Sequence, residues 1–303
     1  MHVEVSGLLP NREYFYRFRA GAATNPVGRT KTAPAPGTSL AEMSFTFVSC
    51  QQYEHGYFTA YRRLAEEYLD LVVHLGDYIY EYASNEYRAP GGNVRVHEGG
   101  EITTLAAYRR RHAHYRSDRD LRAAHAAFPF VITWDDHEVE NNYANEIPES
   151  GQSPTAFLQR RASAYQAYYE NVPRRRRSEP EGPDTLLYRR LPYGDLAEFN
   201  LLDTRQYRDD QAADDGNDPP NPEQQDPART LSPARRRSGG SWTASPPLGR
   251  PGTCSPSRSS SPIGTSRSGP DSGSAWTPGT VTSAPAIASR TLSWSATCPT
   301  RWS

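Results

Sequence analysis

The sequence has little lysine, little cysteine and no long apolar run. Lys31 is the single lysine, and 34 lysine and arginine residues face 35 acidic ones in 303 residues, which leaves a formal net charge of −1. This balance points to no class of charged partner, so we expect no nucleic-acid-specific binding. Three cysteines, an odd number, do not make a disulfide framework. We expect no membrane span, because no apolar run could cross a bilayer, and the first residues lack the charged-then-apolar order of a signal peptide.

Histidine is absent after His137, and apolar periodicity is absent after about residue 230. Residues 231–303 are dominated by serine, proline, threonine, arginine and glycine, so we expect a disordered tail. A reading-frame error explains this change better than an evolved stalk. With GC-rich codons, residues 252–261 read two bases later permit Asn-Val-Leu-Ala-Gln-Gln-Val-Phe-Phe, the pattern of a buried strand. The same shift near residues 291–297 permits Asn-Pro-Val-Val-Val-Gly-Asp-Val.

The densest polar motif is Trp-Asp-Asp-His-Glu-Val-Glu-Asn-Asn-Tyr at residues 134–143. It follows Phe130–Thr133, an aromatic and β-branched run that predicts a short buried strand. Carboxylates packed beside a histidine are costly without a cation to neutralise them. The motif therefore favours a metal site. The alternative is a polar, turn-rich loop in which His137 is an ordinary hydrogen-bonding residue.

Strands and helices alternate along the middle of the chain, which predicts an α/β fold. The expected strands are Phe45–Val48, Leu71–Leu75, Phe130–Thr133 and Phe199–Leu202, and the expected helices cover residues 57–68, 105–128 and 155–170. Strand, helix and strand in this order indicate a parallel crossover unit. Parallel strands deliver the residues that follow them to one sheet edge, where ligands bind. We therefore expect Cys50, Asp77 and Asp136 to meet there, with Tyr80 close behind.

Residues 3–33 have the alternating pattern of β structure. Leu8, Pro10 and Tyr14 match the Leu-x-Pro-x-x-x-Tyr corner of fibronectin type III-like sandwiches, and this resemblance makes Tyr14 the corner residue. A whole sandwich needs about 100 residues, so we expect only its last strands. The predicted domains are a sandwich remnant (1–33), a linker (34–43), an incomplete catalytic domain (44–230) and the tail (231–303).

Four motifs follow one another along the chain. They are Phe-Val-Ser-Cys at 47–50, His-Leu-Gly-Asp-Tyr-Ile-Tyr-Glu at 74–81, Trp-Asp-Asp-His-Glu at 134–138 and Leu-Asp-Thr-Arg-Gln-Tyr-Arg at 202–208. Together they resemble the PhoD-like alkaline phosphatases of the calcineurin-like metallophosphoesterase class. The resemblance implies sheet layers flanked by helices, hydrolysis of phosphate monoesters and diesters, an extracellular or periplasmic location, and Fe3+ and Ca2+ as cofactors.

The resemblance also assigns roles to five residues. Asp77 is similar to the aspartate that bridges the two metals, while Cys50 and Tyr80 are similar to the thiolate and phenolate ligands of the ferric ion. Asp136 matches a ligand of the calcium site, and His137 matches the histidine that protonates the leaving oxygen. Read without the resemblance, Cys50 could instead be a small buried hydrophobe at a strand end.

The sequence departs from the class in its late ligands. A Gly-Asp-x-His-type motif belongs on a C-terminal strand, but no histidine follows His137. We therefore expect a phosphoester hydrolase in origin, with little or no activity in the 303-residue chain. The alternatives are a non-catalytic, degenerate fragment that binds metal weakly, or an arginine-rich binding module using residues 174–177 and the tail. We expect residues 174–177 to be a solvated surface run, and the histidines at 112 and 125 to be surface or packing residues.

Overall fold

A computed structural model describes residues 2–149, 151–208, 210, 253–254 and 292–295. The strands are β1 (Glu13–Tyr16), β2 (Arg19–Ala20), β3 (Ala23–Thr24), β4 (Gly28–Lys31), β5 (Glu42–Val48), β6 (Leu71–His74), β7 (Phe130–Ile132), β8 (Arg189–Tyr193), β9 (Ala197–Leu201), β10 (Thr253–Cys254) and β11 (Leu292–Ser295). The helices are η1 (Tyr53–His55), α1 (Thr59–Leu64), α2 (Leu105–Tyr115), α3 (Arg119–Ala127), α4 (Pro154–Asn171) and η2 (Arg176–Ser178).

The three central strands, β5, β6 and β7, form a parallel sheet. Phe45 pairs with Leu71, and Val72 pairs with Phe130, so the predicted crossover unit is confirmed. Side chains alternate across the sheet, because Val72 lies in one hydrophobic cluster while Leu71 and Val73 lie in the other. Both faces are therefore covered, and the ends of the strands are the free positions for a site.

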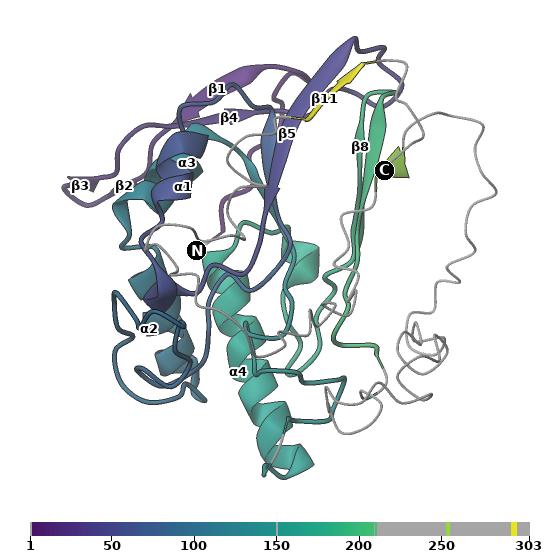
Figure 1. Ribbon diagram of the computed structural model, residues 1–303. Helices are drawn as coiled ribbons and strands as arrows, with labels where there is room; N and C mark the ends of the chain where they lie inside the picture. Colours follow the sequence, from purple (N-terminus) through teal and green to yellow (C-terminus); the bar gives the residue numbers. More distant parts are fainter. Residues whose placement is uncertain (1, 150, 209, 211–252, 255–291, 296–303) are drawn as a thin grey trace, which may run out of the picture.

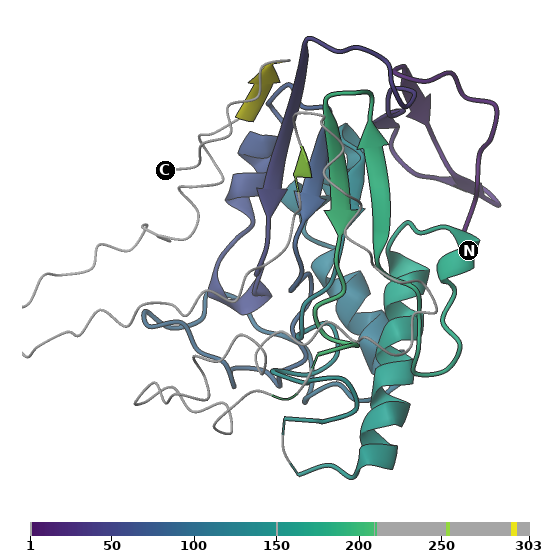
Figure 2. The same cartoon turned by 90° about the vertical axis from the view of Figure 1, so that its right-hand side faces the viewer.

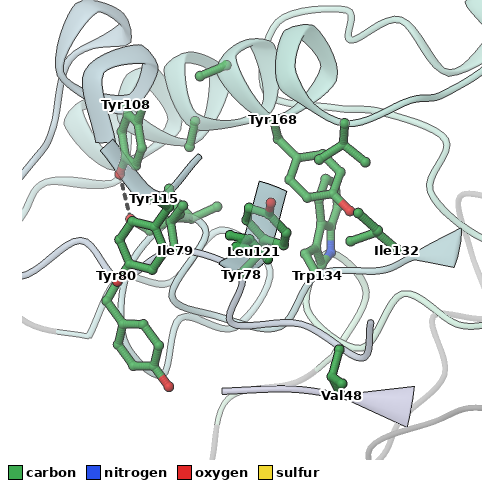
Figure 3. Close-up of a cluster of buried hydrophobic side chains, with 14 of the residues drawn as sticks. Val48, Tyr78, Ile79, Tyr80, Tyr108, Tyr115, Leu121, Ile132, Trp134 and Tyr168 are labelled. Atoms are coloured by element: carbon green, nitrogen blue, oxygen red, sulfur yellow. Dashed lines mark hydrogen bonds between the residues drawn. The ribbon is translucent and has the colours of Figure 1, made fainter. Parts of the chain in front are cut away.

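Helices cover the face of the sheet on which Val72 lies. Figure 1 shows α1 and α3 on one side of β5, with α2 and α4 below them. Their aromatic side chains fill the larger cluster, where Tyr108, Trp134 and Tyr168 are almost wholly buried. In Figure 3, Tyr80 lies at one end of this cluster, and its ring turns away from the helix that crosses the top of the view. The core thus extends to the strand ends.

An antiparallel hairpin covers the other face. β8 and β9 pair antiparallel, and Phe199 of β9 packs edge-on against Phe45 of β5 with ring centroids 5.4 Å apart. Figure 2 shows this hairpin in front of the central strands. The strand expected at Phe199–Leu202 is thus found as β9, in a second layer. The residues that follow it return to the same end of the molecule as the residues that follow β7, since Thr133 Oγ1 donates to Leu202 O at 3.0 Å.

Two predicted helices differ from the structure. The single helix expected over residues 105–128 is wrong, because the chain breaks into α2 and α3 at Asp118. The Asp118 carboxylate accepts hydrogen bonds from Asp120 N at 2.9 Å and Leu121 N at 3.0 Å, which starts a new helix. The helix expected over residues 57–68 is confined to α1.

The N-terminal strands form two small antiparallel pairs, β1 with β4 and β2 with β3. The Tyr14 hydroxyl accepts a hydrogen bond from Leu9 N at 2.7 Å, which is the kind of bond a tyrosine corner makes. Membership of the fibronectin type III-like class stays a prediction. Within the described part of the chain, no helix has the length and apolar character needed to cross a membrane.

Most of the predicted disordered tail, residues 231–303, lies outside the described residues. Two described pieces fall within it, where β10 pairs with β9 and β11 pairs with β5, and disorder of the rest of the tail stays a prediction. Each piece adds to the outer edge of a strand, where backbone N–H and C=O groups are open to pairing.

Candidate metal centre

The turns after β5 and β6 are joined at their tips. Cys50 donates its backbone N–H to Gly76 O at 3.1 Å, and Gln51 N donates to Asp77 O at 3.1 Å. Cys50 and Asp77 both adopt left-handed backbone conformations, with φ of 55° and 56°. Such conformations are uncommon outside glycine and cluster at functional sites. The Cys50 side chain is exposed, so its interpretation as a buried hydrophobe is wrong.

Gly76 lets a third segment approach these turns. A Cβ atom built at Gly76 would lie 2.4 Å from Asp135 N and 2.6 Å from Trp134 C, and its φ is +114°. Only glycine fits here, because both the space and the backbone conformation exclude a side chain. This contact places the segment after β7 against Asp77.

We expect the substitution Gly76→Ala to destabilise the protein by about 2–4 kcal/mol, since it combines backbone strain with a backbone clash. Gly92→Ala is the matched control, because Gly92 has a φ of +87° but nothing within 4 Å of the added carbon. That control is expected to cost about 1 kcal/mol. Urea unfolding of both variants measures the difference in the free energy of unfolding. Equal decreases in the two variants would show that the close contact with Asp135 does not contribute to stability.

Three candidate ligands converge at the strand ends. Asp77, Asp136 and His137 each offer one ligand atom, and these atoms lie within 4.8 Å of one another. All three residues are buried. Two carboxylates brought together in a buried site repel one another, and a cation removes that cost. The arrangement therefore suits a metal ion.

Tyr80 lies beside this group. Its hydroxyl donates to Asp77 Oδ2 at 3.5 Å, and its ring stacks on His137 with centroids 4.1 Å apart. Burial raises the pKa of Tyr80 well above its ordinary value, and electrostatic interactions with Asp77 and Cys50 raise it further. The phenol, the thiol and the carboxylate are thus close enough to affect one another. The carboxylate oxygens suit a hard cation, and the thiol and phenol suit a second cation that can bind thiolate.

Glu81 orients His137. Its Oε2 atom lies 2.9 Å from His137 Nδ1, and its Oε1 atom accepts Asn141 N at 2.7 Å. Burial lowers the pKa of His137, but Glu81, Asp136 and Asp77 outweigh it and raise that pKa to about 10. These carboxylates therefore favour the charged form of the imidazole. With Nδ1 held by Glu81, its other nitrogen is the one that can reach a substrate.

Arg205 and Glu138 hold the acidic segments in place. Arg205 Nε donates to Asp135 Oδ1 at 2.7 Å, and its Nη2 donates to Asp136 Oδ1 at 3.0 Å. Burial raises the pKa of Asp136, but Arg205 and His137 outweigh it and lower that pKa to about 2. Glu138 accepts backbone N–H groups from Asp77 at 3.2 Å, Tyr78 at 2.6 Å and Asp135 at 2.9 Å. Glu138 therefore ties the turn after β6 to the segment after β7.

Sequence reasoning assigned no role to Glu81, Glu138 or Arg205, although each lies in a quoted motif. Their partners across the fold are 56–70 residues away, so no local spacing marks these contacts. The motif that contains Arg205 is held by Asp203, whose Oδ1 accepts Trp134 Nε1 at 3.2 Å. The only sequence feature that pointed to these three residues is that each lies within one of the four motifs.

The remaining polar candidates are packing residues. His112 is buried, and burial lowers its pKa to about 3. His125 lies 2.8 Å from the Tyr78 hydroxyl and stacks on Phe130, so the packing interpretation of both histidines agrees with the structure. The solvated-surface interpretation is wrong for Arg174. Its side chain is buried, and its guanidinium lies 5.9 Å from the centre of the Trp134 ring, because the chain folds it back over the aromatic core.

Comparison with known proteins identifies the family. The family model described as PhoD-like phosphatase matches residues 45–236, and the model of the PhoD-like phosphatase N-terminal domain matches residues 1–34. Alkaline phosphatase D of Bacillus subtilis (strain 168) is 65% identical over 231 residues, which cover 76% of this chain and 40% of that protein.

A solved structure of PhoD agrees with this assignment. A structure of PhoD matches with a TM-score of 0.74 and 64% identity, covering 77% of this chain and 45% of that one. A structure of the purple acid phosphatase PPD1 of yellow lupin (Lupinus luteus) has a TM-score of only 0.39 at 14% identity. That match covers 65% of this chain and 31% of the lupin chain. The chain thus spans less than half the length of alkaline phosphatase D and of the solved PhoD chain. From the family models and the 65% identity, the chain belongs to the PhoD-like phosphatase family.

Proposed function

We propose that this chain carries the metal-binding half of a phosphoester hydrolase. The observation that supports this most is the convergence of Asp77, Asp136 and His137 within 4.8 Å at the ends of parallel strands. The kind of reaction follows from membership of the PhoD-like phosphatase family. Phosphate monoesters and diesters outside the cell are the proposed substrates.

The proposed ligands are Cys50, Tyr80 and Asp77 for Fe3+, and Asp77 with Asp136 for Ca2+. When bound, a pair of cations would neutralise phosphate oxygens and lower the pKa of an attacking water. Asp77 serves both cations in this proposal. The donor types are suitable, since thiolate and phenolate favour the ferric ion and carboxylate oxygens suit calcium.

His137 is the proposed general acid. Its Nδ1–H donates to Glu81, so its Nε2–H can donate to the oxygen that leaves phosphorus. Glu81 acts through His137 by holding the ring and favouring the charged imidazolium. Arg205 pairs with Asp135 and Asp136, and its charge lowers the pKa of Asp136.

A second candidate, a non-catalytic fragment with weak metal binding, is favoured by one observation. No histidine follows His137 in the sequence. By resemblance, two-metal sites of the calcineurin-like class take histidine ligands from late strands of the domain. In this proposal the second half of the metal site would lack those ligands.

Metal analysis and a phosphodiesterase assay separate the two candidates. We expect the 303-residue chain to bind metal weakly and to hydrolyse bis(p-nitrophenyl) phosphate slowly or not at all. A version re-read two bases later after about residue 230 should regain a packable strand pattern, bind iron and calcium, and lose its activity to a chelator. Full activity of the 303-residue chain with stoichiometric metals would overturn the frame-error prediction. Inactivity of the re-read version with metals bound would overturn the proposed hydrolase.

A further inference from the structure

We propose that Tyr82 and Tyr87 form an aromatic wall beside His137 that binds a planar aromatic group of the ester. This inference rests on the proposed function. It makes aryl-type phosphate esters, in which the ring is attached through the leaving oxygen, the preferred substrate class of this site. The aromatic wall consists of these two residues.

The aromatic wall is continuous with the proposed general acid. The Tyr82 ring lies 5.4 Å from the His137 ring and 5.5 Å from the Tyr87 ring. Tyr87 also lies 6.3 Å from Tyr80, which itself stacks on His137. A path of ring contacts therefore leads from the imidazole outward to Tyr87.

The aromatic wall is open to solvent, unlike the core. Tyr87 is 46% exposed, and Tyr82 is partly buried. The tyrosines of the core, such as Tyr78 and Tyr108, are fully buried (Figure 3). Among the described residues, none makes a hydrogen bond to the Tyr87 hydroxyl. A single exposed aromatic side chain is common on protein surfaces. The exposed Tyr87 ring, however, contacts Tyr80 and Tyr82 beside His137, so it offers a stacking surface next to the proposed site.

The loop that carries Tyr87 is held in position by a buried carboxylate. Glu54 is fully buried and accepts Asn85 N at 3.1 Å, His97 N at 2.7 Å and Asn93 Nδ2 at 3.1 Å. These bonds fix the loop on both sides of Tyr87. His55 adds a ring contact at 4.7 Å, and its Nε2 lies 3.1 Å from Tyr87 O. The aromatic wall is therefore positioned before any ligand arrives, which reduces the entropy lost on binding.

The occupant follows from the proposed role of His137. The oxygen that His137 protonates carries the leaving group, so this group must extend from the imidazole toward the nearest free surface. Tyr82 contacts the His137 ring and Tyr87 contacts Tyr82, so these two partly exposed rings offer such a surface next to the imidazole. Flat aromatic groups gain most from such a surface, because ring faces and edges attract one another beyond their area of contact.

A binding experiment tests the aromatic wall without turnover. Phenylphosphonate and methylphosphonate share the phosphonate head and differ in the ring, and neither can be hydrolysed at an ester bond. We expect the metal-loaded chain to bind phenylphosphonate about tenfold more tightly by calorimetry, the factor typical of one stacked ring. Tyr87→Ala should remove this preference and leave methylphosphonate binding and metal content unchanged, while Tyr87→Phe should retain the preference.

Tyr68→Ala is the matched control. Tyr68 is 78% exposed and precedes β6, at the opposite end of the strand from Asp77, so its removal should change neither affinity. A metal-loaded chain that binds both phosphonates equally would overturn the aromatic wall and leave the proposed function standing. The aromatic wall would also be overturned if Tyr87→Ala bound both phosphonates more weakly by the same factor and Tyr87→Phe bound them more weakly as well. Failure of both ligands to bind any loaded variant would overturn the proposed function together with the wall.

Discussion

Replacing Asp77 with alanine, in the version re-read two bases later after about residue 230, is expected to remove both metal ions and with them all hydrolysis. Asp77 is buried, follows β6 directly and lies within ligand distance of Asp136 and His137. Its carboxylate is the proposed bridge, so its loss leaves each cation short of a ligand. Elemental analysis of the purified variant should find less than about a tenth of the metal in the parent protein. Removing a residue that only hydrogen-bonds to a metal ligand already lowers metal affinity about 10- to 100-fold, and Asp77 is a proposed ligand itself.

Asp195→Ala is the control for this experiment. Asp195 is an exposed carboxylate in the turn between β8 and β9, and it accepts Leu40 N at 3.3 Å. Because β9 runs from this turn toward Asp203, Asp195 lies at the end of the hairpin opposite the site. Its removal should leave metal content unchanged. Full metal content in the Asp77 variant would contradict the assignment of the bridge.

Replacing His137 with alanine is expected to slow turnover by about 10²- to 10⁴-fold, the usual contribution of a general acid, while metal content stays at its parent value. The test needs a version of the chain that turns over, and steady-state kinetics with elemental analysis of the same preparation give both results. The geometry makes this a sharp test, because His137 lies within 4.8 Å of both carboxylates.

Loss of metal from His137→Ala would show that His137 is a ligand rather than an acid. His114→Ala is a suitable comparison, because His114 lies on α2 and takes no part in the convergence at the strand ends. It should change neither metal content nor rate. A His137 variant with full metal and full rate would remove the residue from the mechanism altogether.

The strands and their meeting point could be predicted from the sequence for a physical reason. Runs such as Leu71–His74 are buried on both faces, so they are apolar throughout and easily recognised. Parallel strands then deliver the residues after them to one edge. This is why Asp77 and Asp136 were expected together, and the structure places their carboxylates within ligand distance of each other.

The supporting contacts could not be predicted, because they join segments far apart in the chain. Nothing near Arg205 indicates that it pairs with Asp135 and Asp136, and nothing near Glu138 indicates that it accepts the amides of the turn after β6. The burial of Arg174 has the same origin. Its neighbours in sequence suggest a solvated run, while the rings of Trp134 and Tyr168 that cover it come from other elements.

The most direct test is to locate the metals. Crystals of the chain soaked with iron and calcium, measured on both sides of the iron absorption edge, would give anomalous difference peaks that identify each ion. We predict an iron peak within about 2.0–2.5 Å of the Asp77 and Tyr80 oxygens and the Cys50 sulfur, with a calcium peak bound by Asp77 and Asp136. Ions bound elsewhere on the chain, with none between Asp77 and Asp136, would contradict the proposed centre.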